Sequence, residues 1–258
     1  MILKGKTVII TGVGPGMGRA MALGAAREGA NVALCARSEA FLSEVLADVS
    51  RQGGHGIAVR TDVSSTSDCE RLVKETLDAF GRIDGIVNSA YFHPPWSSLE
   101  SADLEDLHRA FDVNCVGALR VIRAALPTMK GQRSGSIVNI GTLATRKPMV
   151  GEGAYAMAKA ALSQCTRQLA VELGQFGIRV NQAVMGWMMG EPLRQYFDGM
   201  PDRSAAQAEQ AKVVSRIALA RIPPDFDCAR AVYFLLSDYS SEMTGAALDV
   251  NGGEWVTP

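Results

Sequence analysis

The sequence predicts an α/β domain built on a doubly wound parallel sheet of about seven strands, with helices on both faces. Short runs of apolar and β-branched residues alternate along the 258 residues with longer segments of helical spacing, which is typical of parallel sheets with helical crossovers. The apolar fraction of 47% suits a sheet that is covered on both faces. Because no linker, repeat or low-complexity stretch divides the chain, we expect one domain over residues 1–258.

The predicted strands are, in chain order, residues 7–10, 32–35, 56–59, 85–88, 137–140, 178–183 and 246–250. Helices are predicted between them, since apolar residues recur there at helical spacing, as at Phe41, Val45 and Val49. The two longest are expected at about residues 104–129 and 153–175. Their broad apolar faces fit packing on the sheet and also fit contact between subunits.

Residues 185–224 interrupt this alternation with three glycines and four prolines around a helical stretch at 205–218. Long insertions in compact domains are often lids or binding loops. The apolar and aromatic side chains of this segment favour a substrate lid over an ordinary surface excursion.

Composition narrows the class of protein. A net charge of -1 at pH 7 gives no reason to expect a nucleic acid or an anionic membrane as partner. No apolar run is long enough to span a bilayer, and the first residues lack the layout of a signal peptide. The five cysteines are widely spaced and form no C-x-x-C pair. We therefore expect free thiols in a cytoplasmic protein, without a metal site or disulfide.

A glycine-rich turn, Thr-Gly-Val-Gly-Pro-Gly-Met-Gly at residues 11–18, follows the first predicted strand and leads into a helical pattern. Such a turn lets a phosphate rest on the free N–H groups at the start of the helix. Its spacing, T-G-x-x-x-G-x-G with an additional Gly14, differs from the commoner G-x-G-x-x-G. By itself the turn is also compatible with a tight turn of no function.

Tyr155 and Lys159 lie four residues apart in an Ala-rich, helix-forming run, so both side chains share one helix face. A phenol titrates near ~10, and a nearby ammonium lowers that pKa. Beside an oxidised nicotinamide, the pair could serve as general acid and base for an alcohol or a carbonyl. Alone, such a pair is more often a chance feature of a surface helix.

Together these features resemble the short-chain dehydrogenase/reductase family over nearly the whole chain, from Lys6 to Gly253. The glycine turn matches the family's coenzyme loop, and Tyr155 and Lys159 match its Tyr-x-x-x-Lys signature. The resemblance implies a Rossmann-type domain that transfers a hydride between NAD(P) and a hydrophobic ketone or secondary alcohol. The alternative is a coenzyme-binding protein without turnover. The family's enoyl-reducing branch usually spaces its Tyr and Lys further apart.

The resemblance also implies roles for single residues. Tyr155 would exchange a proton with the substrate oxygen, Lys159 would lower the pKa of Tyr155 and bind the nicotinamide ribose, and Asn114 would support a proton relay. Thr142 stands where most members have Ser; it keeps the hydroxyl, but its methyl restricts the rotamer. Alternatively, Thr142 merely ends a strand and the site is inert.

The implied coenzyme contacts are Thr11, Gly12, Gly14, Gly16, Met17, Gly18, Arg37, Asp62, Val63, Asn88, Ala90, Tyr155, Lys159, Gly186 and Met188. Ala36 occupies the position where NAD-preferring members carry an acidic residue, and Arg37 follows it. A guanidinium with no carboxylate beside it favours NADP(H). NAD(H) remains the alternative because the glycine turn lacks a second basic residue. Met185 and Gly190 replace the family's usual Pro and Thr, so backbone groups alone would hold the carboxamide.

The substrate pocket is expected to be lined by Tyr91, Leu143, Met149, Trp187, Met189 and Leu193. Such apolar and sulfur-containing walls suit a hydrophobic ketone or alcohol, and no cationic cluster for a highly anionic substrate is evident. His93 is interpreted as an ordinary loop residue, with substrate orientation as the alternative. The family resemblance further implies a homo-oligomer, either a dimer or a tetramer.

Overall fold

The centre of the molecule is one parallel sheet, and the computed structural model describes residues 1–256 of the predicted domain, with 257 and 258 outside this range. The strand order is β3-β2-β1-β4-β5-β6-β7. The strands are β1 (Thr7–Thr11), β2 (Asn31–Ala36), β3 (His55–Arg60), β4 (Gly85–Asn88), β5 (Gly135–Thr142), β6 (Ile178–Met185) and β7 (Ala247–Val250). All seven predicted strands are confirmed, with ends that differ by at most two residues.

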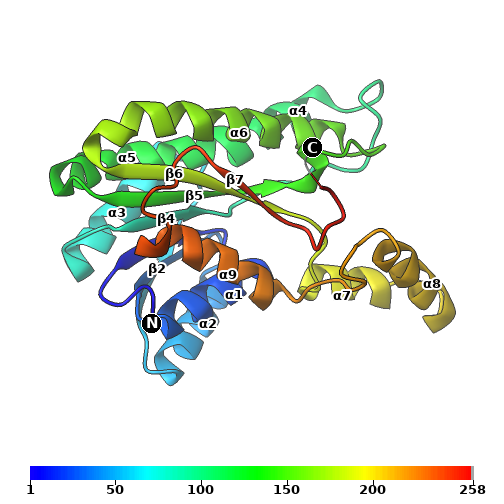
Figure 1. Ribbon diagram of the computed structural model, residues 1–258, viewed down its shortest axis with the longest axis horizontal. Helices are drawn as coiled ribbons and strands as arrows, with labels where there is room; N and C mark the ends of the chain where they lie inside the picture. The colour runs from blue at the N-terminus through cyan, green and yellow to red at the C-terminus, as the bar shows by residue number, and fades with distance from the viewer. Residues whose placement is uncertain (257–258) are drawn as a thin grey trace.

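Helices cover both faces of the sheet, as Figure 1 shows. One layer consists of α1 (Met17–Arg27), α2 (Glu39–Arg51) and α9 (Asp225–Leu236). The other contains α3 (Thr66–Phe80), α5 (Gly117–Gln132) and α6 (Gly153–Leu173). Successive residues of β1 serve the two layers in turn: Val8 and Ile10 pack into the first, and Ile9 into the second. This explains why every residue of the strand is apolar or small.

The helix expected over residues 104–129 is interrupted. It consists of α4 (Leu104–Phe111), a π-helical turn (Asp112–Val116) and then α5. π-helical turns inside helices occur often at functional sites. Here the turn carries Asn114, whose side chain binds the loop after β4, as described below.

The sheet reverses its direction of growth between β1 and β4, because β2 and β3 extend to one side of β1 and β4–β7 to the other. Ligands of open α/β sheets bind in the crevice at the carboxyl ends of the strands at such a switch point. The Thr11 hydroxyl joins the two central strands there. It accepts hydrogen bonds from the backbone N–H groups of Ser89 (3.0 Å) and Ala90 (3.1 Å).

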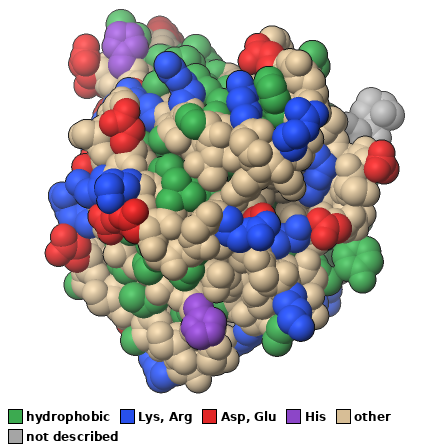
Figure 2. All heavy atoms as spheres, turned by 90° about the vertical axis from the view of Figure 1, so that its left-hand side faces the viewer, with side chains coloured by type: hydrophobic (Ala, Val, Ile, Leu, Met, Phe, Trp, Pro, Cys, Tyr) green, Lys and Arg blue, Asp and Glu red, His purple; other side chains and the backbone are tan. Residues whose placement is uncertain are grey.

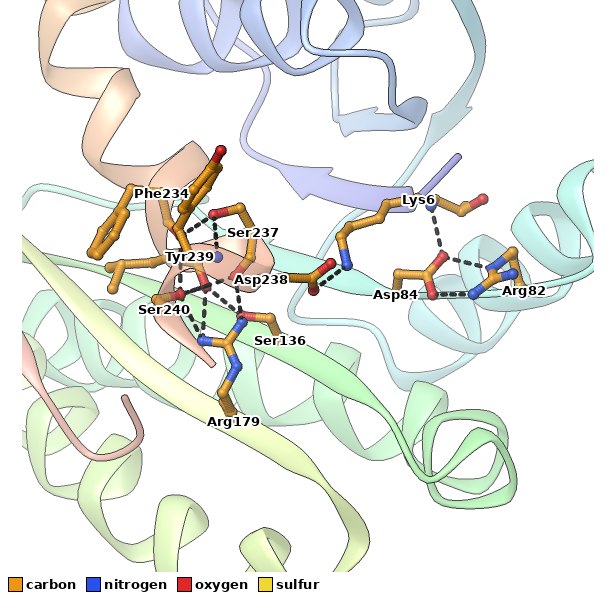
Figure 3. A network of polar contacts seen from close by, with 12 residues as sticks. Lys6, Arg82, Asp84, Ser136, Arg179, Phe234, Ser237, Asp238, Tyr239 and Ser240 are labelled. Carbon is orange, nitrogen blue, oxygen red and sulfur yellow. Dashed lines mark hydrogen bonds and ion pairs between the residues drawn. The ribbon is translucent and has the colours of Figure 1, made fainter. Parts of the chain in front are cut away.

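The amino ends of the strands are held by a polar network (Figure 3). Arg179 donates to the carbonyl oxygens of Leu235 (3.0 Å) and Ser237 (3.0 Å), which lie at the end of α9. The Asp84 carboxylate accepts hydrogen bonds from the Arg82 guanidinium and from the backbone N–H of Thr7. The network fixes the amino ends of the strands, at the end of the sheet opposite the crevice.

The segment between β6 and α9 holds two helices, α7 (Glu191–Asp198) and α8 (Arg203–Val214). They extend from the carboxyl-end side of the sheet in Figure 1. The segment has a small apolar core of its own, made by Phe197, Val213, Ile217 and Ile222, which we call the lid cluster. The predicted helix at 205–218 corresponds to α8, whereas α7 was not predicted.

The surface away from α7 and α8 carries Lys and Arg side chains interspersed with Asp and Glu, as Figure 2 shows. Within residues 1–256 no helix combines the length and the apolar character that crossing a bilayer demands. All five cysteines are free thiols.

Candidate active site

A cleft of about 1620 Å³ opens at the carboxyl ends of the strands. The glycine turn, the loops after β2, β4 and β5, and the start of α7 form its walls. Most of the predicted site residues line it: Gly12, Gly14, Gly16, Met17, Gly18, Arg37, Asp62, Val63, Ala90, Tyr91, Thr142, Leu143, Met149, Tyr155, Lys159, Gly186, Trp187, Met188 and Leu193.

Four predicted residues lie behind the cleft wall. Thr11 and Asn88 are buried in the sheet, and Asn88 donates its amide to the Asn139 side chain (2.9 Å). Asn114 is buried as well. Met189, expected in the substrate pocket, packs on the lid cluster and is not among the residues that line the cleft. Its backbone N–H is bound to the Pro223 carbonyl (2.8 Å).

The glycine turn fits a phosphate-bearing coenzyme. Gly16 precedes α1 with φ 100°, and no side chain caps the first N–H groups of the helix. Gly18 lies so close to the preceding turn that a Cβ there would be 2.3 Å from the Gly12 carbonyl oxygen. The N-terminus of α1 therefore has no side-chain cap and opens to the cleft, as an anion site at a helix start requires.

The adenine end of this site would lie between the ends of β2 and β3. Asp62 accepts hydrogen bonds from the backbone N–H (2.9 Å) and hydroxyl (2.6 Å) of Ser64. These bonds lower the pKa of Asp62, with smaller contributions from Arg37 and Arg60. Arg37 is exposed along this part of the cleft.

The catalytic candidates meet where α6 begins beside the end of β5. The Lys159 ammonium donates to the Ile140 carbonyl (2.9 Å) and lies 5.9 Å from the centre of the Tyr155 ring. Thr142 is the last residue of β5. A hydrogen bond from its side chain lowers the pKa of the Tyr155 phenol. The helix thus brings the predicted pair to the hydroxyl that the strand supplies.

Burial dominates the ionisation of this pair. It raises the pKa of Tyr155, as do Tyr91 and Glu152, while Thr142 lowers it. Burial also lowers the pKa of Lys159 to about 8. The pKa of Tyr155 is therefore raised overall, not lowered as expected from Lys159, because burial removes the hydration of the phenolate.

Asn114 holds the loop that follows β4. Its side-chain oxygen accepts from the Phe92 N–H (2.9 Å), and its amide donates to the Phe92 carbonyl (2.8 Å). This pair of bonds fixes the loop that carries Tyr91 and His93 into the cleft.

The departures from the family pattern have steric reasons. Met185 is buried and pairs with Thr142 on β5 and Val250 on β7, so it belongs to the core. Gly190 caps α7, and a Cβ there would lie 3.2 Å from Asp225 Oδ2 and 3.4 Å from the Cα of Gly16. A threonine at 190 would push α7 away from the glycine turn.

Sequence reasoning missed several charged residues of the cleft. His93 and Glu152 form a close pair (3.1 Å), and Lys147 binds the buried carboxylate of Glu254 (3.1 Å). Lys212 and Arg216 of the lid segment also line the cleft, although no cationic cluster for a highly anionic substrate was evident in the sequence. No spacing in the sequence links these residues. His93 and Glu152 are 59 positions apart and Lys147 and Glu254 are 107 apart, so only the fold brings them together. Within residues 1–256, no set of His, Cys, Asp or Glu side chains could hold a metal ion.

Comparisons with known proteins agree with this geometry. The family model described as enoyl-(acyl carrier protein) reductase matches residues 12–254. An uncharacterized oxidoreductase of Thermotoga maritima is 33% identical over 253 residues, which cover 98% of both chains. The L-rhamnose 1-dehydrogenase (NAD(P)(+)) of Sphingomonas sp. is 32% identical over 257 residues, or 99% of this chain and 98% of the relative.

Among solved structures, an NAD+-bound xylitol dehydrogenase superposes with a TM-score of 0.90 at 28% identity. The match covers 98% of this chain and 100% of that one. Since sequence and fold agree over nearly the whole length, the chain belongs to the short-chain dehydrogenase/reductase family.

Proposed function

We propose that this NAD(P)-dependent oxidoreductase interconverts a hydrophobic ketone and the corresponding secondary alcohol. The observation that carries the proposal is the meeting of Tyr155, Lys159 and Thr142 at the end of β5, beside apolar walls. The four-residue spacing of Tyr155 and Lys159 favours chemistry at a carbonyl or alcohol over reduction of an enoyl double bond. The comparisons give no support to a coenzyme-binding protein without turnover.

The chain's own residues divide the work. The N-terminus of α1 would hold the coenzyme's phosphates, and Lys159 would hold the nicotinamide ribose. The bound coenzyme supplies or accepts the hydride. Tyr155 gives a proton to the substrate oxygen during reduction and takes one during oxidation. The Thr142 hydroxyl orients that oxygen, and Asn114 keeps the loop after β4 in place around it.

For the coenzyme, NADP(H) is preferred over NAD(H) in this proposal. Arg37 is exposed at the end of the cleft, where a 2′-phosphate would lie, and Ala36 offers no carboxylate. Two of the three similar proteins named above are described with NAD(P)(+) and NAD+, so either coenzyme is compatible with the fold.

Assembly and location complete the proposal. Apolar side chains are exposed on α4 and α6, namely Leu104, Phe111, Met157 and Val171. We assign this face to a homodimer or homotetramer, and the free thiols favour the cytoplasm.

The proposal is tested by following the absorbance of reduced nicotinamide against a panel of medium-sized apolar ketones, sugars and polyols. Apolar ketones should react fastest, and Tyr155→Phe should abolish turnover while coenzyme still binds. Turnover confined to polyols would refute the substrate class, and full activity of Tyr155→Phe would refute the mechanism.

A further inference from the structure

His93 presents both ring nitrogens to groups that can only accept hydrogen bonds. Nδ1 lies 2.7 Å from the Pro94 carbonyl oxygen, and Nε2 lies 3.1 Å from Glu152 Oε2. A neutral imidazole carries one N–H, so it satisfies only one of these acceptors. The arrangement therefore selects the imidazolium, in which both nitrogens donate.

This ring lies directly against the proposed acid/base. The ring centres of His93 and Tyr155 are 4.7 Å apart, with a tilt of 34°, and Trp96 stacks near the imidazole at 5.7 Å. Glu152, immediately before α6, is only 7% exposed, whereas the His93 side chain retains 26% exposure to the cleft. The pair is thus partly desolvated, and its imidazole lies against the ring of Tyr155.

We infer that His93, as an imidazolium paired with Glu152, is a positioning residue for Tyr155. His93 packs against the phenol ring and neutralises the Glu152 carboxylate beside it. This inference rests on the proposed role of Tyr155 as acid and base. Without the imidazolium, the buried charge of Glu152 disfavours the phenolate that alcohol oxidation requires. Protonation of His93 therefore supports the basic form of Tyr155.

The electrostatic surroundings agree in sign. Glu152 raises the pKa of His93 above its usual value, against the effect of burial, and Glu152 also raises the pKa of Tyr155. Other ionisable groups near the pair are Tyr91, which raises the pKa of Tyr155, and Lys159, 5.9 Å from the phenol ring. On α4, Arg109 stacks over Phe92 in the same loop, at 4.2 Å.

The first test is the pH dependence of kcat/KM for alcohol oxidation in wild type, His93→Gln, Glu152→Gln and the double variant. His93→Gln leaves the carboxylate uncompensated and should lower kcat/KM about tenfold in the pH range where wild-type His93 is protonated, the order expected for a unit charge at this separation, with the two profiles converging above that range. Glu152→Gln should raise kcat/KM in that range, and the double variant should return it towards wild type. Equal profiles in wild type and His93→Gln overturn the inference.

The second test is independent of activity. NMR titration of the His93 ring should give a pKa above ~6.5 in wild type and a lower value in Glu152→Gln. His108 is the matched control, because it pairs with Glu105 at 4.0 Å on the exposed surface of α4; His108→Gln should leave the kinetic profile unchanged. A His93 pKa that does not respond to Glu152→Gln overturns the pairing.

The outcomes separate the inference from the proposed function. An active Tyr155→Phe variant refutes the function, whatever His93 does. An inactive Tyr155→Phe variant, together with a His93→Gln variant that loses kcat without any shift in pH profile, keeps the function and reduces His93 to a packing role, which overturns the inference.

Discussion

Lys159 is a buried cation whose ammonium has a single polar partner among residues 1–256, the Ile140 carbonyl. Burial lowers its pKa from 10.5 to about 8. Below about pH 8 both folded and unfolded chains carry this proton, so the full cost of burying the charge is present. Between about pH 8 and 10.5 the unfolded chain binds more protons than the folded chain. The cost of burying Lys159 therefore falls, and the free energy of unfolding rises with pH.

We therefore expect the stability difference between wild type and Lys159→Met to change across this window by on the order of 3 kcal/mol in favour of wild type. Denaturant unfolding at several pH values measures it, and the cysteines, which both proteins share, cancel in the comparison. A difference that stays constant as pH rises contradicts the lowered pKa.

Arg37 sets the proposed coenzyme preference. Arg37→Asp removes a charge-assisted hydrogen bond to a 2′-phosphate and should weaken NADP binding by about ten- to a hundredfold, with NAD binding retained. Arg60→Asp is the control, since Arg60 ends the neighbouring strand β3 without lining the cleft. Equal NADP affinity in wild type and Arg37→Asp, measured by titration, would exclude the assigned role.

Single residues also show how far sequence reasoning reaches. Tyr155 and Lys159 were predictable because four residues on a helix fix their common face. His93 and Glu152 were not, because their contact depends on how the loop after β4 folds over the start of α6. Likewise, spacing predicts that Lys159 is near Tyr155, but only burial in the folded protein shows that desolvation controls both ionisations.

At the scale of elements, α7 begins in contact with the glycine turn. A Cβ on Gly190 would lie 3.4 Å from the Cα of Gly16, and Pro192 Cδ lies 3.2 Å from a Cβ built on Gly16. Gly190→Ala should therefore shift α7 and raise KM for the coenzyme several-fold, while losing only about 1 kcal/mol of stability as a helix cap.

Gly131→Ala in α5 is the matched control for this prediction, because a Cβ there meets nothing within 4 Å. It should leave KM unchanged and stabilise the protein by up to about 1 kcal/mol. Steady-state kinetics and thermal unfolding of both variants decide the matter, and an unchanged KM in Gly190→Ala would show that α7 does not restrain the turn.

The strands were predictable as elements because both faces of the sheet are covered, which leaves continuous apolar runs. The π-helical turn at Asp112–Val116 was not, because one additional residue per turn hardly alters the apolar periodicity of a long helix. The Met185–Pro224 region resisted prediction for a related reason. Its apolar residues serve the lid cluster as well as the cleft, so composition alone could not separate Met189 from Leu193.

At the scale of the whole molecule, the exposed apolar face of α4 and α6 predicts subunit contact. Val171→Asp, at a side chain that is 82% exposed, should shift the protein to smaller species in sedimentation velocity, since a stable interface needs an apolar centre. Val150→Asp, at 91% exposure in the loop before α6, should not. Wild-type protein that sediments as a monomer would rule out the assembly.

The contact between Gly16 and the start of α7 has a thermodynamic consequence. The two segments belong to different ends of the sequence, yet each defines the position of the other. If an ordered α7 increases the affinity for the coenzyme, then bound coenzyme must stabilise the ordered α7 by the same free energy, because such coupling is reciprocal. If substrate also contacts this segment, we expect it to bind more tightly once coenzyme is bound, and coenzyme to bind more tightly in the presence of substrate by the same factor.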